Sequence, residues 1–190
     1  MKRAFDFTAS LAAIILLSPL FLVIALIILI SDGSPVIYKQ VRIGKDKKEF
    51  TIFKFRTMKN GTRLAPTGAL KESEQQLIGA GKLLRKSSLD ELPQLFNILK
   101  GDMSFVGPRP LIINEGNIHE LREAAGIYAI RPGLTGWAQI NGRDTVSNEQ
   151  KVALDKEYIE KQSLLFDFKI LVLTFTSVLK SKDIADGGEI

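Results

Sequence analysis

The sequence has no cysteine and only one histidine among its 190 residues. Without cysteine the chain cannot form disulfides or thiolate metal sites, a composition typical of proteins from reducing compartments. A single histidine excludes sites built from several imidazole ligands and leaves His119 as the one candidate imidazole base. Because His119 lies in a polar stretch, we expect it to be an ordinary surface residue.

Several familiar catalytic motifs are also missing. The chain has no glycine-rich Walker loop, no serine nucleophile elbow and no histidine pair suited to a metal. It shows no internal repeat, and its 45% hydrophobic content is enough for one domain with a core. The net charge of +5 predicts an anionic partner, which could be nucleic acid, a bilayer surface or a phosphorylated substrate.

Formal charge is absent between Asp6 and Asp32, where residues 11–30 are almost continuously apolar. As a helix this run would be about 30 Å long, enough to cross a bilayer. A cleaved signal peptide is the alternative, but the run is long and no small-residue cleavage site follows it. We therefore expect a retained membrane segment.

Ser18 and Pro19 interrupt the middle of this segment. Proline lacks an amide donor and kinks a helix, and the serine hydroxyl can bond the carbonyl that is freed. Two topologies stay open: a mildly kinked helix that spans the bilayer, and a sharply kinked segment that enters and leaves on one face. Basic residues lie on both sides of the segment, which slightly favours the same-face hairpin.

Residues 36–43 and 50–56 are rich in β-branched and aromatic residues and are separated by a turn-like stretch that begins at Gly44. This pattern predicts an antiparallel hairpin. Lys54 and Arg56 would lie on one face of the second strand, where we expect solvent rather than a bound anion. The polar stretch 59–81 that follows is typical of a lid or binding loop, with disorder as the alternative.

Two adjacent carboxylates, Asp90 and Glu91, follow a basic pair and precede an apolar helical pattern that Gly101 is placed to end. The apolar positions with helical spacing are Leu92, Leu95, Phe96 and Leu99. Ser88 with Glu91 matches a capping box, in which each side chain bonds a backbone amide at the start of a helix. By itself the pattern favours capping over catalysis, because acidic first turns are common.

Two later segments set arginines among glycines and prolines. Residues 101–110 are too rich in both for regular structure, and Pro108 and Pro110 hold Arg109 in a stiff backbone suited to phosphate recognition. The segment 131–144 repeats this chemistry. With a membrane segment and a carboxylate pair, these arginines predict a site for a phosphorylated substrate, where an aspartate could attack phosphorus and a divalent cation could reduce charge repulsion.

The C-terminal part contains two predicted helices. Ser147 with Gln150 is a capping box for a helix that runs to about Lys161, in which we expect Asp155 and Tyr158 to be structural. Residues 168–179 are apolar at helical spacing but too few to cross a bilayer. We expect them in the core or in the membrane interface.

Five ordered motifs resemble the bacterial sugar transferase family, the small monotopic phosphoglycosyl transferases, and together they extend over nearly the whole chain. The motifs are Lys54-Phe55-Arg56-Thr57-Met58, Ser88-Leu89-Asp90-Glu91-Leu92-Pro93-Gln94-Leu95, Gly101-Asp102-Met103-Ser104, Val106-Gly107-Pro108-Arg109-Pro110 and Arg131-Pro132-Gly133-Leu134-Thr135-Gly136. The resemblance implies an α+β, mostly helical fold with a re-entrant membrane helix over residues 1–33, broken at Ser18 and Pro19. Residues 34–190 would form a catalytic domain with a small antiparallel β-hairpin, long irregular loops and interfacial helices, at the cytoplasmic face of the bacterial plasma (inner) membrane.

The same resemblance implies a two-step reaction. Asp90 would attack the β-phosphate of a UDP-sugar and release UMP, and polyprenyl (undecaprenyl) phosphate would then take the phosphosugar to begin a surface glycan. Asp90 would also contact Mg²⁺, and Glu91 would support the metal or take a proton from the acceptor. The substrate-binding residues expected from the resemblance are Lys54, Arg85, Arg109, Pro110, Arg131 and Arg143.

The resemblance does not identify the sugar, for which we expect an N-acetylated aminosugar, with specificity in the stretches 60–81 and 112–130. Membrane lipids are expected partners, nucleic acid is not, and a homodimer stays open. Two alternatives remain. One is a membrane-anchored scaffold that binds anionic lipids and uses Asp90 and Glu91 only as a cap; the other is single-step transfer with Asp90 as metal ligand or base.

Overall fold

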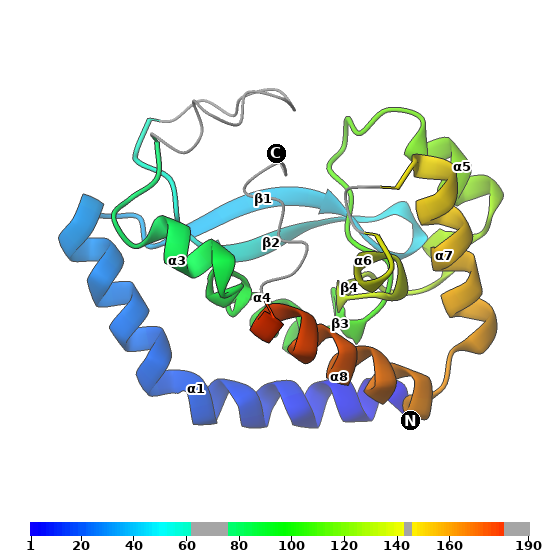
Figure 1. Ribbon diagram of the computed structural model, residues 1–190, viewed down its shortest axis with the longest axis horizontal. Helices are drawn as coiled ribbons and strands as arrows, with labels where there is room; N and C mark the ends of the chain where they lie inside the picture. The colour runs from blue at the N-terminus through cyan, green and yellow to red at the C-terminus, as the bar shows by residue number, and fades with distance from the viewer. Residues whose placement is uncertain (62–75, 143–145, 181–190) are drawn as a thin grey trace.

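A computed structural model describes residues 1–61, 76–142 and 146–180 of the chain. It is mostly helical with two small two-stranded sheets (Figure 1). The first half contains α1 (Lys2–Asp32), β1 (Ile37–Ile43), η1 (Lys45–Lys47), β2 (Glu49–Phe55), α3 (Gly81–Lys86), η2 (Leu89–Glu91) and α4 (Gln94–Lys100). The second half contains β3 (Ser104–Val106), α5 (Ile118–Ala124), η3 (Ile127–Ala129), β4 (Gly133–Thr135), α6 (Trp137–Ile140), α7 (Asn148–Lys161) and α8 (Leu164–Lys180).

The helix α1 has 31 residues and bends sharply about midway along its length (Figure 1). Pro19 lies inside it and cannot bond the carbonyl of Ile15, so the Ser18 hydroxyl donates to that carbonyl instead, at 2.8 Å. The predicted kink and the predicted role of Ser18 are therefore confirmed. Among the described residues, α1 alone is long and apolar enough to cross a membrane, by length and composition.

The predicted hairpin is confirmed: β1 pairs antiparallel with β2, from Ile37 opposite Phe55 to Ile43 opposite Glu49. The helix α4 is attached to β2 by the buried amide of Asn97, which donates to the Thr51 carbonyl at 2.7 Å and accepts from the Phe53 amide at 3.1 Å. This amide satisfies backbone groups of β2 that β1 does not reach.

The burial of α4 corrects the predicted apolar face. Phe96 is 41% exposed, whereas Asn97 and Ile98 are fully buried. The prediction assumed that only apolar side chains turn inward, but the hydrogen bonds of Asn97 to β2 rotate the helix toward that residue. Gly101 ends the helix with a φ of 97°, as predicted.

A second sheet lies where irregular structure was expected. The strand β3 pairs parallel with β4, with Ser104 opposite Gly133 and Val106 opposite Thr135. The glycines that argued against regular structure permit this pairing, because a β-carbon on Gly133 would lie 2.1 Å from the amide nitrogen of Gly107. The sheet brings the two arginine-bearing segments together.

The helix α7 begins with the predicted capping box, in which Ser147 and Gln150 each bond the other's backbone amide. Asp155 and Tyr158 are buried in α7 and make structural contacts, as predicted. The helix α8 extends the predicted apolar stretch, and near its start Asp167 forms an ion pair with Lys2 of α1.

The structure corrects the expectation for His119. Its Nδ1 lies 2.6 Å from the Tyr128 hydroxyl and its Nε2 lies 2.7 Å from the Ile112 carbonyl oxygen. Since that carbonyl can only accept, Nε2 carries the proton and Nδ1 accepts from the tyrosine. His119 is half-buried and joins α5 to the segments around it, which a polar local sequence does not reveal.

Candidate active site

Asp90 and Glu91 lie in η2, a single turn between α3 and α4, and not in a capped helix. Ser88 has a left-handed backbone with φ of 56° and makes no side-chain capping bond. A serine cap requires an extended backbone, so the predicted capping box at Ser88 and Glu91 is wrong. The left-handed residue turns the chain between α3 and α4, and the Glu91 carboxylate is directed to another partner.

That partner is Lys54 of β2, whose Nζ lies 2.9 Å from Oε1 of Glu91. The expectation that Lys54 and Arg56 face solvent is therefore wrong. Arg56 is buried, forms an ion pair with Asp32 and donates to the carbonyl of Pro35. The alternation of the strand was correct, but both cations meet partners from distant parts of the chain.

Asp90 is 9% exposed, and its pKa is raised to about 6. Burial is the main cause, because a desolvated carboxylate loses the hydration of its charge, and the neighbouring charge of Glu91 adds to it. Lys54 and Arg85 oppose the shift with their positive charges. The result is a carboxylate that is ionised at neutral pH but held in an unfavourable environment, as is typical of reactive groups.

Arg85 comes from α3 and donates through Nε to the Thr57 hydroxyl at 3.0 Å. Burial lowers the pKa of the Arg85 guanidinium, and the negative charge of Asp90 opposes this change. An arginine in such a place keeps its charge. The structure thus brings Arg85, Lys54 and the carboxylate pair together, as the proposed phosphate chemistry requires.

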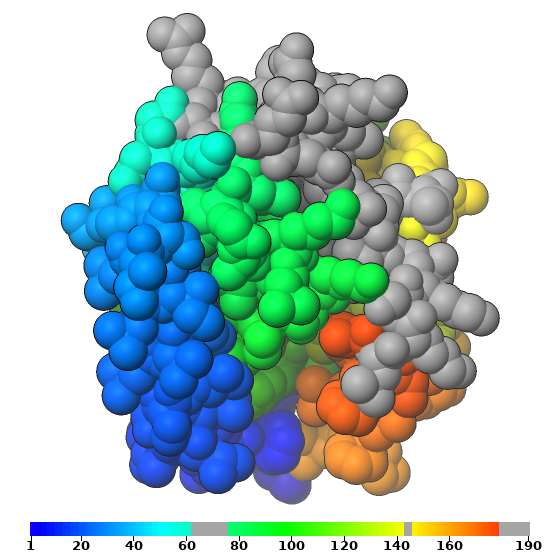
Figure 2. Space-filling view, turned by 60° about the vertical axis from the view of Figure 1, so that its left-hand side comes forward, coloured from blue at the N-terminus to red at the C-terminus, as the bar shows by residue number. Residues whose placement is uncertain are grey.

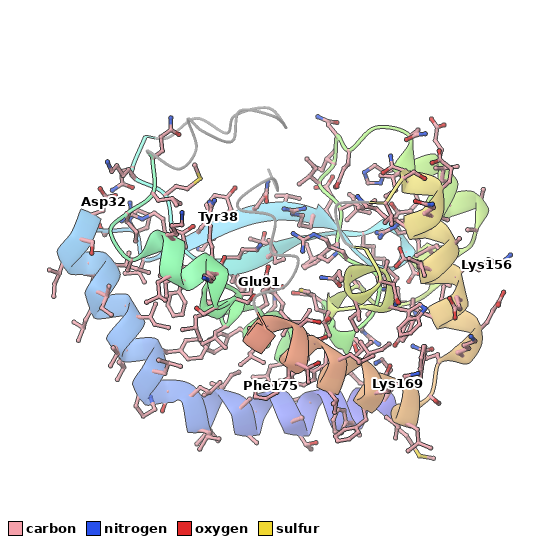
Figure 3. All side chains as sticks on the ribbon, viewed as in Figure 1. Asp32, Tyr38, Glu91, Lys156, Lys169 and Phe175 are labelled. Carbon is pink, nitrogen blue, oxygen red and sulfur yellow. The ribbon has the colours of Figure 1, made fainter. Side chains whose placement is uncertain are left out.

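A cleft open to solvent adjoins this cluster. Its lining residues are Arg42, Ile52, Lys54, Glu91, Gln94, Arg109, Pro110, Gly133, Leu134 and Gln139. Three cations face one carboxylate there, so the lining favours an anionic ligand. Four of the predicted site residues, Lys54, Glu91, Arg109 and Pro110, come together in this cleft. Figure 3 shows Glu91 beside the hairpin.

Sequence reasoning missed Arg42, Gln94 and Gln139 as lining residues of the cleft. Gln139 lies within the segment 131–144, which was noted only for its cations. Arg42 lies on the first hairpin strand, one of the predicted elements, but nothing in that strand's alternation distinguishes it from a solvated cation. Only the packing of β3 and β4 against the hairpin reveals these residues as part of the site.

Buried guanidinium groups hold the Arg109 loop by its backbone. Arg122 donates to the Arg109 carbonyl at 2.7 Å, and Arg42 donates to the Pro110 carbonyl at 3.2 Å. Arg122 is itself paired with Asp155, with Nη2 2.7 Å from Oδ2 and both side chains buried. The stiffness expected from the two prolines is therefore supported by α5 and α7.

The remaining predicted site residues are Arg131, Arg143, Ser18 and Pro19. Arg131 donates through Nε to the Gly101 carbonyl at 2.7 Å, so its role in binding substrate stays a prediction. Arg143 lies outside the described residues. Ser18 and Pro19 lie in α1, where they form the bend.

A metal site made wholly from protein ligands is absent from the described residues, since no three His, Cys, Asp or Glu side chains gather there. Mg²⁺, however, is commonly held by one or two carboxylates together with substrate phosphates and water. The adjacent carboxylates of Asp90 and Glu91 fit that donor set beside a cationic cleft. Mg²⁺ therefore stays a prediction that the residues present can accommodate.

Comparison with known proteins agrees with this geometry. The family model described as "Bacterial sugar transferase" matches residues 1–181. The uncharacterized sugar transferase EpsL of Bacillus subtilis is 44% identical over 97% of this chain and 90% of its own length. The exopolysaccharide production protein ExoY of Sinorhizobium fredii is 40% identical over 95% of this chain and 86% of its own length.

A third relative is named for its reaction. The UDP-glucose:undecaprenyl-phosphate glucose-1-phosphate transferase of Escherichia coli is 39% identical over 92% of this chain and 39% of its own length. The match includes the hairpin, the carboxylate pair and the arginine loops described above. The chain belongs to the bacterial sugar transferase family, whose members act as glycosyl-1-phosphate transferases.

Proposed function

We propose that this protein transfers a sugar-1-phosphate from a UDP-sugar to undecaprenyl phosphate, forming a polyprenyl diphosphate-linked sugar and UMP. The observation that carries the proposal is the position of Asp90, a buried carboxylate of raised pKa, beside a cleft lined by Arg42, Lys54 and Arg109. The names of the relatives support the substrate classes and a role at the start of exopolysaccharide assembly.

In the first step, a carboxylate oxygen of Asp90 attacks the β-phosphorus of the UDP-sugar. The bond from that phosphorus to the bridging oxygen breaks, and UMP leaves with the electron pair. An acyl phosphate that carries the sugar remains on Asp90. Its desolvated environment favours the attack, because a carboxylate with a raised pKa is more basic and binds a new electrophile more strongly.

In the second step, a phosphate oxygen of the polyprenyl phosphate attacks the same phosphorus. The bond to Asp90 breaks, which restores the carboxylate, and the new bond completes the diphosphate. Any proton on the attacking phosphate passes to Glu91, the neighbouring carboxylate. Lys54 and Arg109 hold the phosphate oxygens in both steps, since charge-assisted hydrogen bonds of this kind are strong in a partly desolvated site.

Asp90 and Glu91 would hold Mg²⁺ together with oxygens of the substrate phosphates. The ion would supply positive charge that reduces the repulsion between the carboxylate and the diphosphate. The other roles belong to residues of the chain: Asp90 forms the covalent bond, and the cations of the cleft orient the substrate.

The membrane role of α1 and α8 completes the proposal. Both helices carry large exposed apolar side chains, including Leu16 and Leu22 on α1 and Leu165 and Phe175 on α8. The two helices lie along one side of the molecule, and on one flank α3 and the residues that follow it lie between them (Figure 2). We propose that they enter one leaflet at the cytoplasmic face, with the bend at Pro19 making α1 re-entrant, so that the site opens where the lipid acceptor lies.

The proposal is tested by UMP release in nanodiscs that contain undecaprenyl phosphate and Mg²⁺, with a panel of UDP-sugars. We expect release with one or a few sugars, and the Asp90→Asn variant should fold and bind membranes but release none. Without lipid acceptor, mass spectrometry should find a phosphosugar on Asp90. Turnover without that adduct would support single-step transfer, and full activity of Asp90→Asn would show that Asp90 is not the nucleophile. An intact protein that binds anionic lipid but releases no UMP would instead be a scaffold.

A further inference from the structure

Gln139 is the polar residue of the cleft with an unsatisfied atom. It lies in α6, and its amide Nε2 donates to the Leu134 carbonyl at 3.5 Å. Its Oε1 is buried and has no hydrogen-bond partner among the residues that the structure describes. The Leu134 carbonyl can only accept a hydrogen bond, so the amide is oriented with Nε2 toward that carbonyl. Oε1 is then the amide atom that has no partner.

The backbone segment beside this oxygen carries no side chain, because it is Gly136. A β-carbon on Gly136 would lie 3.1 Å from Oε1 of Gln139 and 2.2 Å from the Gly107 carbonyl oxygen. Glycine at this position therefore permits the close approach of the Gly107 carbonyl and leaves no β-carbon against the amide oxygen. A buried acceptor without a partner destabilises the protein, so its presence in a binding cleft points to a donor supplied by the ligand.

The chemistry of the ligand restricts what this donor can be. Ionised phosphate oxygens only accept hydrogen bonds, and the three cations Arg42, Lys54 and Arg109 are suited to them. A polyprenyl chain offers no donor. The remaining donors of the two substrates are the hydroxyl or acetamido N–H groups of the sugar and the groups of the uridine.

The position of the cleft indicates whether the donor comes from the sugar or from the uridine. Its lining includes Glu91, the residue next to Asp90, so atoms bound here lie close to the transferred phosphorus. The sugar is attached directly to that phosphate, whereas the uridine is separated from it by the second phosphate. We propose that Gln139 is a specificity-determining residue that accepts a hydrogen bond from the sugar of the donor substrate.

This inference rests on the proposed function and is tested on the full-length protein in nanodiscs. The Gln139→Leu variant removes the acceptor at similar size, and Gln139→Glu keeps an acceptor oxygen there. Asn141→Ala is the matched control, because Asn141 is an exposed amide at the end of α6 that does not line the cleft. For each protein, kcat/KM is measured with UDP-glucose, UDP-galactose and their N-acetylated counterparts, together with the Kd of UMP.

We expect Gln139→Leu to lower kcat/KM for the preferred sugar by about tenfold or more and to reduce its advantage over the other sugars. The Kd of UMP should stay within about twofold of the wild-type value, since the proposed contact is with the sugar and not with the base or ribose. Gln139→Glu should retain the wild-type order of sugars even if all rates fall, and Asn141→Ala should behave as wild type.

Three results would overturn the inference. An equal fall for every sugar with unchanged ratios would make Gln139 merely structural, and a weaker Kd for UMP would place the contact on the uridine. An unaltered Gln139→Leu variant would show that no contact exists. A wild-type protein that releases no UMP from any sugar nucleotide would contradict the proposed function itself, a failure that is visible before any variant is made.

Discussion

The Nζ of Lys54 lies 2.9 Å from Oε1 of Glu91 and joins the second strand of the hairpin to η2, the turn that carries Asp90 and Glu91. Asn97 of α4 fixes the position of α4 along β2, because its side chain bonds the β2 backbone on both sides of Ile52. With α4 held there, the turn η2 that precedes it lies close to Lys54, whose charge acts on Asp90 as well as on Glu91. The contact between the hairpin and η2 therefore places a positive charge that opposes the effects of burial and of Glu91 on the pKa of Asp90.

Asp90 should make the folded protein less stable when it is ionised. Its folded pKa of about 6 lies above the ordinary value of 3.8, so the stabilisation from the neutral form is fully present below pH 3.8 and is lost as pH rises through about 6. We expect Asp90→Asn to raise the free energy of unfolding by about 1–3 kcal/mol at pH 8 without Mg²⁺. Chemical denaturation in detergent at pH 8 and pH 4.5 measures the difference, which should shrink at the lower pH.

The same shift predicts how Lys54 affects catalysis. Lys54 lowers the pKa of Asp90, so Lys54→Met should move the acid limb of the pH profile of kcat/KM to higher pH and lower kcat/KM by about 100-fold. Lys47→Met is the control. Lys47 lies in η1, at the end of the hairpin away from Lys54, and forms an exposed ion pair with Glu123 of α5. A folded Lys54→Met enzyme with an unmoved acid limb would refute the coupling.

The buried pair of Arg122 and Asp155 should matter for both stability and substrate binding. Arg122→Met leaves Asp155 buried without its partner and should destabilise the fold by about 3–5 kcal/mol. The double variant Arg122→Met with Asp155→Leu should recover much of that stability. Its KM for the UDP-sugar should still rise about tenfold, because the Arg109 carbonyl has lost its donor.

For this pair the control is Lys161→Met, which removes an exposed ion pair with Glu157 and should change the free energy of unfolding by less than about 0.5 kcal/mol. A double variant with normal KM would mean that the pair serves stability alone.

The topology of α1 can be tested directly because the chain has no cysteine. Single cysteines placed next to Met1 and at Lys45 should both resist a membrane-impermeant maleimide in intact cells and react after lysis. A cysteine at Glu123, in α5, is the reference, because it reports the side of the membrane on which α5 lies. Labelling of the first position from outside, with the other two protected, would establish a spanning helix and exclude the re-entrant hairpin.

Local sequence signals determined the elements themselves. The apolar run, the proline bend with its serine bond to Ile15, the hairpin, the left-handed Gly101 and the capping box at Ser147 all follow from patterns within a few residues. Such features depend on backbone geometry and nearby hydrogen bonds, which neighbouring residues specify. The five motifs also identified the family, and the comparisons confirm it.

Tertiary structure decided what the side chains of those elements do. The sequence favoured a capping role for Glu91 and solvent for Lys54, but the fold brings the two together across 37 residues and buries Asp90 beside them. The parallel pairing of β3 with β4, the support of the Arg109 loop by Arg122 and the buried, unsatisfied oxygen of Gln139 likewise depend on distant segments. Desolvation and charges from distant segments set the pKa of Asp90, and neither has a local sequence signature.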